Sequence, residues 1–333
     1  MEQGHRTSVP RDGLARARES GYGRGMRGVA ATLLLAAAAA WSCRPGRQEQ
    51  ATTAAAVAVA GAPAGWEIVY DFEPRRDWID LYLIPAGGGA PRLLAEDGSL
   101  GRWTPDGKSV VFSSSRRTGN RPQLWAIDED GSHLRRLRTN EATEYQADVS
   151  PDGSQLAFLS NLDGPERLLT QDLRTGAARE LVRHGEHTIF GNPHWSPDGR
   201  QITFSSNHRV GHQIYVVDVA SGQQRRISPL TSGGCEPRFS RDGKRVVYVS
   251  RGHMRPTSRL VAHDLATDEE TTLVDWPALT YDPVYSPDGS ELAFASNIAG
   301  NYALYRQRLA DGKAWRLTFG PGDARNPDYR PVR

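Results

Sequence analysis

Hydrophobic and polar residues alternate with a period of two in short stretches that recur over most of the chain. In residues 201–206, Ile202 and Phe204 alternate with polar neighbours, which is the pattern of a half-buried β-strand. A tight turn precedes this strand. Pro197 supplies the fixed φ of a type I turn, and Gly199 can adopt the left-handed conformation that reverses the chain. The stretch therefore predicts a β-hairpin.

The same turn occurs five times at nearly equal spacing. Its copies are Thr104–Gly107, Ser150–Gly153, Ser196–Gly199, Ser240–Gly243 and Ser286–Gly289. The aspartates of successive turns are separated by 46, 46, 44 and 46 residues. Each interval has room for four short strands, and a period in this range is typical of propeller blades. The repetition therefore predicts a β-propeller.

The two ends of the repeating region predict how the ring closes. Residues 66–70 resemble the second strand of a blade and have no turn before them, whereas residues 326–331 resemble a first strand and end there. One fragment supplies the first strand of a blade and the other supplies its remaining strands, so together they complete one blade. Their pairing closes the ring and removes exposed strand edges. We therefore predict an all-β, six-bladed β-propeller of four-stranded antiparallel blades over residues 64–333. The ring is closed by pairing the C-terminal strand with the N-terminal blade.

A specific sequence run accompanies the period. Residues 193–199 read Pro-His-Trp-Ser-Pro-Asp-Gly, and residues 214–218 read Ile-Tyr-Val-Val-Asp. This repeat resembles that of TolB-type β-propellers, which is also found in the propeller domains of prolyl-oligopeptidase-like enzymes and of oligogalacturonate lyases. The resemblance implies a non-enzymatic module that binds a protein partner in the cell envelope through its loop face and channel mouth. The alternative is a carbohydrate-active enzyme similar to oligogalacturonate lyase.

The beginning of the chain resembles a bacterial export signal. Arg24 and Arg27 precede an apolar run over residues 29–41, which is too short to span a bilayer comfortably. The run ends before Cys43, which resembles the lipidation site of bacterial lipoproteins. We therefore predict a targeting segment at 1–43, a flexible tether at 44–63, and a lipid-anchored protein in the periplasm or at the outer membrane. A plain signal peptide and an uncleaved anchor remain alternatives, and translation could start at Met1 or Met26.

Composition limits the classes of partner. The formal net charge is +2, but residues 43–333 contain 35 basic and 36 acidic residues. The basic excess therefore lies in the targeting segment, and no nucleic-acid partner is predicted. We expect a monomer that contacts the membrane only through its anchor. The sequence contains no nucleophile elbow, phosphate loop, zinc finger or Rossmann fingerprint, so no catalytic residue is assigned. Cys235 is expected to be a free, buried thiol.

One polar residue precedes the proline or alanine of the innermost strand in five repeats. These candidate binding residues are Gln146, Asn192, Glu236, Asp282 and Asn326. The repeat geometry places them in a ring at one mouth of the central channel. They either cap the strand starts with local hydrogen bonds or contact a ligand or partner. The sequence leaves both interpretations open.

Histidines are concentrated in the third intact repeat. His184, His187, His194, His208 and His212 all fall within 29 residues. Imidazole is a good ligand for transition metals, so convergence of these side chains would favour the enzyme alternative with a divalent transition metal. The binding-module interpretation requires no cofactor. The two classes of function therefore differ in whether these histidines meet.

Overall fold

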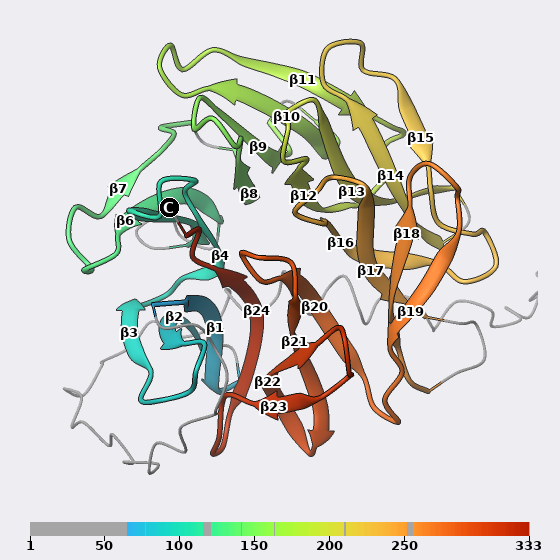
Figure 1. Cartoon of the computed structure of the whole chain (residues 1–333). Helices are drawn as coiled ribbons and strands as arrows, with labels where there is room; N and C mark the ends of the chain where they lie inside the picture. Colours follow the sequence, from blue (N-terminus) through green and yellow to red (C-terminus); the bar gives the residue numbers. More distant parts are fainter. Residues whose placement is uncertain are drawn as a thin grey trace, which may run out of the picture. The chain divides into compact units, whose positions relative to one another are not determined.

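The described residues of the computed structural model form six four-stranded antiparallel sheets that follow one another around a ring (Figure 1). The structure describes residues 65–332 except 77, 116–120, 141, 163, 210 and 252–255. The predicted all-β, six-bladed propeller is confirmed. Within the described ranges, no helix is long and apolar enough to cross a membrane.

Blade 1 combines the two ends of the described chain, and the other blades are continuous in sequence. Blade 1 contains β24 (Asp323–Tyr329), β1 (Glu67–Arg75), β2 (Trp78–Pro85) and β3 (Arg92–Ala95). Blade 2 contains β4 (Ser99–Trp103), β5 (Ser109–Ser114), β6 (Gln123–Asp128) and β7 (Arg135–Arg136). Blade 3 contains β8 (Glu144–Val149), β9 (Gln155–Ser160), β10 (Arg167–Asp172) and β11 (Ala178–Arg183).

The remaining blades have the same order, from the innermost strand to the outermost. Blade 4 contains β12 (Phe190–Trp195), β13 (Gln201–Arg209), β14 (Gly211–Asp218) and β15 (Gln224–Arg226). Blade 5 contains β16 (Gly234–Phe239), β17 (Arg245–Ser250), β18 (Arg259–Asp264) and β19 (Glu270–Val274). Blade 6 contains β20 (Thr280–Tyr285), β21 (Glu291–Ala299), β22 (Asn301–Arg308) and β23 (Ala314–Arg316).

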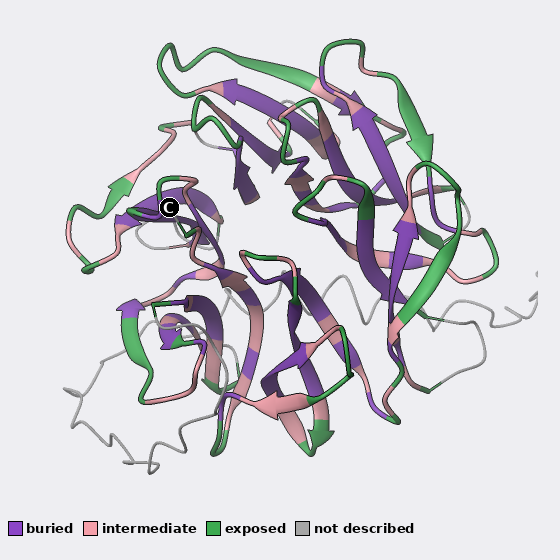
Figure 2. Ribbon diagram, in the orientation of Figure 1, coloured by how far each residue is buried: buried purple, intermediate pink, exposed green. Residues whose placement is uncertain are grey.

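The core lies between neighbouring blades. Each second strand buries one aromatic side chain that is at most 2% exposed: Tyr70, Phe112, Phe158, Phe204, Tyr248 and Phe294. Burial of each such ring contributes roughly 1.5–3 kcal/mol. Figure 2 shows buried residues along the inner and middle strands, whereas the outermost strands β3, β7, β11, β15 and β19 carry exposed residues. The alternation in the sequence therefore matches the burial.

Ring closure occurs as predicted. Strand β24 pairs antiparallel with β1, with Ile68 opposite Tyr329 and Val69 opposite Asp328. Tyr329 is 1% exposed, and its ring lies edge-on to Trp66 at 5.9 Å between centroids. Since β24 supplies the innermost strand of blade 1, the C-terminal residues are part of the core. The predicted targeting segment, tether and lipidation site at Cys43 lie outside the described residues.

The repeated turn connects the first and second strands of five blades. Its glycines, such as Gly107 and Gly199, have φ between 65° and 74°. In the turn of blade 4, Asp198 Oδ1 accepts hydrogen bonds from the Ser196 hydroxyl at 2.6 Å and from the Arg200 backbone N–H at 3.0 Å. The aspartate therefore stabilises its own turn. We call this end of the inner strands the turn end and the other end the mouth.

Candidate binding site at the mouth of the channel

The five candidate binding residues occupy one structural position. Each lies at a β-bulge of an innermost strand, where the register with the second strand shifts. Leu100 of β4 occupies the sixth copy of this mouth position. All six residues have positive φ, between 51° and 58°: Leu100, Gln146, Asn192, Glu236, Asp282 and Asn326. This left-handed conformation costs a non-glycine residue about 1–2 kcal/mol, so surrounding contacts must hold it.

Hydrogen bonds from one blade to the next hold three of these bulges. Gln146 Oε1 accepts from the Asn192 backbone N–H at 2.7 Å, and Glu236 Oε2 accepts from the Asp282 backbone N–H at 2.6 Å. Asp282 Oδ2 in turn accepts from the Asn326 backbone N–H at 3.2 Å. These side chains therefore do cap backbone groups, but across blades rather than locally. Part of the predicted ring consequently holds neighbouring blades together.

Asp71 of β1 completes the arrangement at blade 2. The Leu100 backbone N–H donates to both carboxylate oxygens of Asp71, at 2.9 and 3.0 Å, and Asn326 Nδ2 donates to Asp71 Oδ2 at 2.8 Å. Burial raises the Asp71 pKa to about 7, against the opposing effect of these hydrogen bonds. Asp71 lies in a second strand, outside the repeated position from which the mouth residues were predicted. Leu100 could have been found by aligning Trp103 with the aromatic residue that ends four of the five other inner strands.

Two carboxylates and an arginine meet where blades 5, 6 and 1 adjoin. Arg325 Nε lies 3.2 Å from Asp282 Oδ2, and Arg325 Nη2 lies 3.9 Å from Glu236 Oε1. Burial raises the Glu236 pKa to about 8, and the nearby Asp282 charge adds to this shift while Arg325 opposes it. Glu236 is therefore mostly protonated at neutral pH. Glu236 and Asp282 can therefore hold Arg325 in place without both carrying a full negative charge.

Aromatic rings surround this arginine. The Arg325 guanidinium lies over the rings of Tyr281 and Tyr302, at 5.1 and 4.9 Å from their centroids. The two rings are 6.0 Å apart, and both tyrosines are only partly buried. Burial raises the pKa of Tyr281 to about 12, so its phenol stays neutral. We call Tyr281, Tyr302 and Arg325 the Tyr–Arg cluster.

Cys235 lies beside this cluster, one residue before Glu236. It is a free cysteine, as predicted, and although the residue as a whole is only partly buried, its thiol group is buried. Burial of its sulfur, together with the charges of Glu236 and Asp282, raises the thiol pKa well above its usual range. Cys235 is therefore not an activated nucleophile.

Two of the five candidate histidines lie against each other. The rings of His184 and His208 are 3.7 Å apart between centroids, and Nδ1 of each lies 3.2 Å from Ser206 Oγ. Burial lowers the His208 pKa to about 4, with further contributions from His184 and Arg209. His208 is therefore neutral at physiological pH. Neither ring has a third histidine beside it among the described contacts.

The other three histidines occupy different surroundings. His194 Nδ1 accepts a hydrogen bond from the Phe239 backbone N–H at 3.2 Å, and burial lowers its pKa to about 3. His187 and His212 are exposed. In the part of the chain that the structure describes, no group of three or more His, Cys, Asp or Glu residues could hold a metal ion. The residues present therefore do not fit the histidine-held metal considered above.

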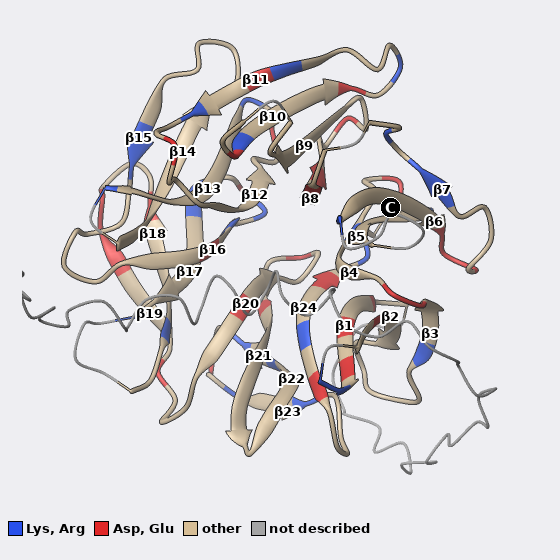
Figure 3. Ribbon diagram, turned by 180° about the vertical axis from the view of Figure 1, so that it is seen from behind, with Lys and Arg blue, Asp and Glu red and all other residues tan. Residues whose placement is uncertain are grey.

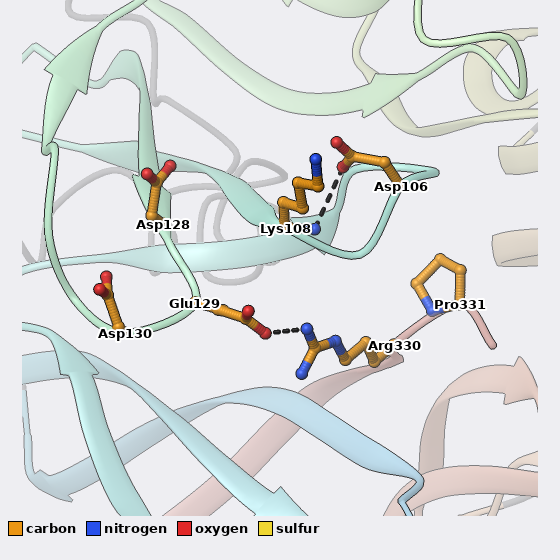
Figure 4. A pocket seen from close by; sticks show the side chains of 7 residues that line it. All are labelled: Asp106, Lys108, Asp128, Glu129, Asp130, Arg330 and Pro331. Carbon is orange, nitrogen blue, oxygen red and sulfur yellow. Dashed lines mark hydrogen bonds and ion pairs between the residues drawn. The ribbon is translucent and has the colours of Figure 1, made fainter. Parts of the chain in front are cut away.

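The turn end has a pocket of its own, of about 520 Å³. It is lined by Asp106, Lys108, Asp128, Glu129, Asp130, Arg330 and Pro331 (Figure 4). An ion pair between Glu129 and Arg330 joins blade 2 to the end of β24. Asp128 also accepts hydrogen bonds from Ser109 and His133, which lower its pKa to about 2. Most of the charged side chains that line this pocket therefore already form hydrogen bonds or ion pairs within the protein.

Closed sheets, bulged inner strands and a polar channel mouth define a six-bladed β-propeller with a candidate ligand-binding end. Residues 149–254 match the PD40 family, described as the TolB beta propeller domain. Protein TolB homolog of Chlorobium chlorochromatii is 26% identical over 149 residues, covering 43% of this chain and 33% of that protein. An uncharacterized protein of Agrobacterium fabrum is 30% identical over 200 residues, covering 57% of this chain and 67% of that protein. The chain is a TolB-like PD40 β-propeller protein.

Solved structures show the same fold. TolB from Acinetobacter baumannii superposes with a TM-score of 0.69 at 21% identity, covering 80% of this chain and 67% of that one. An oligogalacturonate lyase in complex with manganese superposes with a TM-score of 0.53 at 18% identity, covering 72% of this chain and 70% of that one. The chain spans only a third of the Chlorobium TolB homolog. At these identities the structural likeness concerns the fold alone.

Proposed function

We propose that this protein is a non-enzymatic, TolB-like β-propeller of the cell envelope that binds a protein partner through its channel mouth. The observation that carries the proposal is the Tyr–Arg cluster, in which Arg325 stacks on Tyr281 and Tyr302. Tyrosine and arginine are enriched among the few residues that dominate protein–protein binding energy. The mouth therefore has the side chains expected at the centre of an interface.

The groups beneath the cluster favour tight binding. Asp282 holds the Arg325 guanidinium at 3.2 Å, and the stacked rings restrict it further. A side chain that is already ordered loses little conformational entropy when a partner binds. The partly exposed rings offer apolar faces, and their neutral phenols can donate hydrogen bonds. A partner with an apolar side chain flanked by acceptors would complement this surface.

Envelope localisation rests on the sequence of the targeting segment. The apolar run at 29–41 followed by Cys43 supports export and lipid anchoring. Replacing Cys43 with Ser should therefore leave the protein unanchored or uncleaved. Fractionation of cells that produce the substituted protein measures this, and retention in the membrane fraction with the signal removed would contradict the anchor.

The binding test compares the mouth with the turn end. Purified protein is immobilised and exposed to envelope extract, and the retained protein is quantified for the wild type and for a Tyr281→Ala/Tyr302→Ala variant. Loss of two central rings should weaken retention by at least about 30-fold, since each such contact contributes about 1–2 kcal/mol or more. Asp198→Ala, in a turn, is the matched control and should bind like the wild type. If the Asp198 variant lost the partner and the tyrosine variant kept it, the interface would lie at the turn end and the proposal would be contradicted.

The carboxylates are less suitable for this test. Glu236 and Asp282 both accept backbone hydrogen bonds from the next blade, so their removal would alter the fold as well as the surface. The tyrosine side chains, whose rings reach the surface, can be shortened without removing those acceptors. Circular dichroism should therefore change little in the tyrosine variant, and the unfolding midpoint should fall because both rings also pack against the core.

The lyase alternative has weaker support. It needs a metal held by the histidine group, but only His184 and His208 are in mutual contact within the described residues. Metal analysis of the purified protein distinguishes the two functions. Stoichiometric metal that is lost in a His184→Ala/His208→Ala variant, together with cleavage of uronate oligosaccharides, would favour the enzyme.

A further inference from the structure

A second layer of side chains lies two residues beyond the mouth position on each innermost strand. We call it the channel layer: Arg102, Asp148, His194, Arg238, Val284 and Asp328. Each of these residues pairs with the same position of its second strand, as Arg102 does with Val111 and Arg238 with Val247. Five of the six carry ionisable groups at the centre of the ring. Buried charges at such a place require partners.

Three members of this layer bond to the next blade. Asp328 Oδ2 accepts from the Trp103 backbone N–H at 2.9 Å, and Asp148 Oδ2 accepts from the Trp195 backbone N–H at 2.8 Å. His194 Nδ1 accepts the equivalent hydrogen bond at 3.2 Å. Arg102 and Arg238 cannot accept, so they do not serve this purpose. Arg102 instead donates to the Gly101 carbonyl oxygen at 2.7 Å, and its charge counteracts the raised pKa values of Asp148 and Asp328. The place of Arg238 in the layer needs another explanation.

A third arginine reaches the same region from the turn end. Arg241 occupies the turn position that is proline in the four other copies, at 105, 151, 197 and 287. Its Nε and Nη2 donate to the carbonyl oxygens of Ser286 and Tyr285, at 3.2 and 3.3 Å. Its charge interacts with Asp328 and Asp148 across the ring. A residue that fits the turn well has thus been replaced by a cation directed inward.

The channel layer and Arg241 have an excess of positive charge. Three arginines face two aspartates, while burial keeps His194 neutral. Within the described ranges, none of the three arginines forms an ion pair shorter than 4 Å. Arg238 is 5% exposed, and its buried Nη1 has no hydrogen-bond partner. Leaving such a donor unpaired costs about 1–3 kcal/mol or more, so an anion at this place would be stabilised.

The layer is accessible and has donors of suitable geometry. His194 and Asp328 are only partly buried, so this level of the channel is not sealed. Because His194 Nδ1 accepts a hydrogen bond, its proton lies on Nε2, which can donate to a ligand. Figure 3 shows basic positions on the outer strands β7, β11 and β15 as well. Those arginines lie at the rim and several are paired on the surface, such as Arg225 with Asp268 at 2.9 Å. Arg238 differs from Arg225 because its Nη1 is buried without a hydrogen-bond partner and the residue forms no ion pair within the described ranges.

We infer that the channel layer binds a monovalent carboxylate, held by Arg238 and Arg102 with Arg241 and His194 contributing charge and a donor. Three arginines face two aspartates whose pKa values burial raises, so at pH 7 the layer has at least one positive charge in excess, which a single negative charge reduces. The planar guanidinium fork matches the two oxygens of a carboxylate. A free small carboxylate and an acidic side chain of an inserted peptide share this chemistry. The site is separate from the Tyr–Arg cluster and does not depend on the proposed partner binding.

Isothermal titration of the purified protein in chloride-free buffer at pH 7 tests this inference. Acetate should bind with a dissociation constant in the millimolar range, whereas acetamide, which has the same shape but no charge, should not bind. The peptide acetyl-Gly-Glu-Gly-amide is compared with its Gln analogue. Peptide binding as tight as that of acetate identifies an inserted side chain as the source, and binding of acetate alone identifies a free carboxylate.

Two variants and a control make the test decisive. Arg238→Met and Arg241→Pro should each weaken acetate binding at least tenfold, and Arg225→Met, on the surface, should bind acetate like the wild type. Arg241→Pro restores the residue found in the four other turns, so it should fold even if Arg238→Met does not. Equal binding of acetate and acetamide, or acetate binding by Arg241→Pro equal to that of the wild type, would overturn the inference.

Discussion

Acidic side chains accept hydrogen bonds from backbone N–H groups at both ends of the innermost strands, but the N–H groups belong to different parts of the chain. At the turn end, Asp198 and its four counterparts bond to groups within their own turn, as in the contacts with Ser196 and Arg200. At the mouth, Glu236 and Asp282 bond to the backbone of the following blade. The hydrogen bonds within a turn are made by the same residue type in every copy. The hydrogen bonds between blades are made by residue types that differ from one blade to the next.

Electrostatics follow this division. Hydrogen bonds from Ser150 and Ser154 lower the pKa of the exposed turn residue Asp152. At the mouth and in the channel, burial raises the pKa of Asp71 and Asp148 to about 7 and that of Glu236 to about 8. Asp152 therefore stays ionised at neutral pH, whereas carboxyl groups of the mouth and channel titrate near neutrality. Four experiments test this contrast.

Removal of β24 should have the largest effect. Truncation before Asn326 deletes Asp328 and Tyr329, and with them the contacts that close the ring. We expect a loss of at least about 5 kcal/mol and association through the exposed edge of β1. Urea unfolding and light scattering measure both effects. Deletion of only the last two residues is the control, and an unchanged midpoint with monomeric behaviour in the longer truncation would contradict closure.

Matched aspartate substitutions should differ between the two ends. Asp282→Ala leaves the Asn326 backbone N–H and the Arg325 guanidinium without their acceptor, so it should cost about 3 kcal/mol. Asp198→Ala at an exposed turn should cost only about 1 kcal/mol. Urea unfolding of both variants provides the comparison. If the turn variant were the less stable of the two, the contrast between local and shared contacts would fail.

Stability should fall as pH rises from about 5 to 8. The folded protein keeps protons on Asp71, Asp148 and Glu236 that the unfolded chain releases near pH 4, because burial raises these pKa values. The free energy of unfolding is therefore highest below about pH 4 for these groups, and we expect a loss of at least about 2 kcal/mol by pH 8. Urea midpoints across this range measure it. Glu236→Gln should flatten the slope, and stability that rises with pH would refute the assignment.

Substitution of Leu100 should have the smallest effect. Leu100 adopts a φ of 58° without a polar side chain to bond to the next blade. Asn tolerates this conformation better, so Leu100→Asn should stabilise the protein by roughly 0.5–1 kcal/mol. Thermal unfolding measures the gain, with Leu100→Ala as a control that lacks the preference for positive φ. Destabilisation by Asn would show that the leucine side chain contributes packing that outweighs its strain.

The fold was largely predictable from sequence, because its turns and strands repeat. The spacing of the aspartates and the alternation around Phe204 predicted blades, and the incomplete fragments at 66–70 and 326–331 predicted closure. These are local patterns whose meaning does not depend on distant residues. The six-bladed ring follows from them directly.

The site was predictable only in part. The mouth position was found in five blades, but Asp71, Tyr302 and Arg325 were not, since the residue types at their positions differ from blade to blade. Their meeting depends on how blades 5, 6 and 1 adjoin. Histidine proximity in sequence was likewise a poor guide, because His194 and His208 lie on different strands with different surroundings. Which side chains converge is set by the curvature of the ring, and a linear pattern does not encode it.

The pairing of β24 with β1 also determines when the fold can be completed. The hydrogen bond between Asn326 and Asp71 joins residues 255 positions apart. Closing a loop of this length costs a large chain entropy before any contact compensates for it, which slows folding. During synthesis, blade 1 cannot be completed until β24 has been added, and until then the edge of β1 stays unpaired. Assembly of the ring is therefore timed by its final strand.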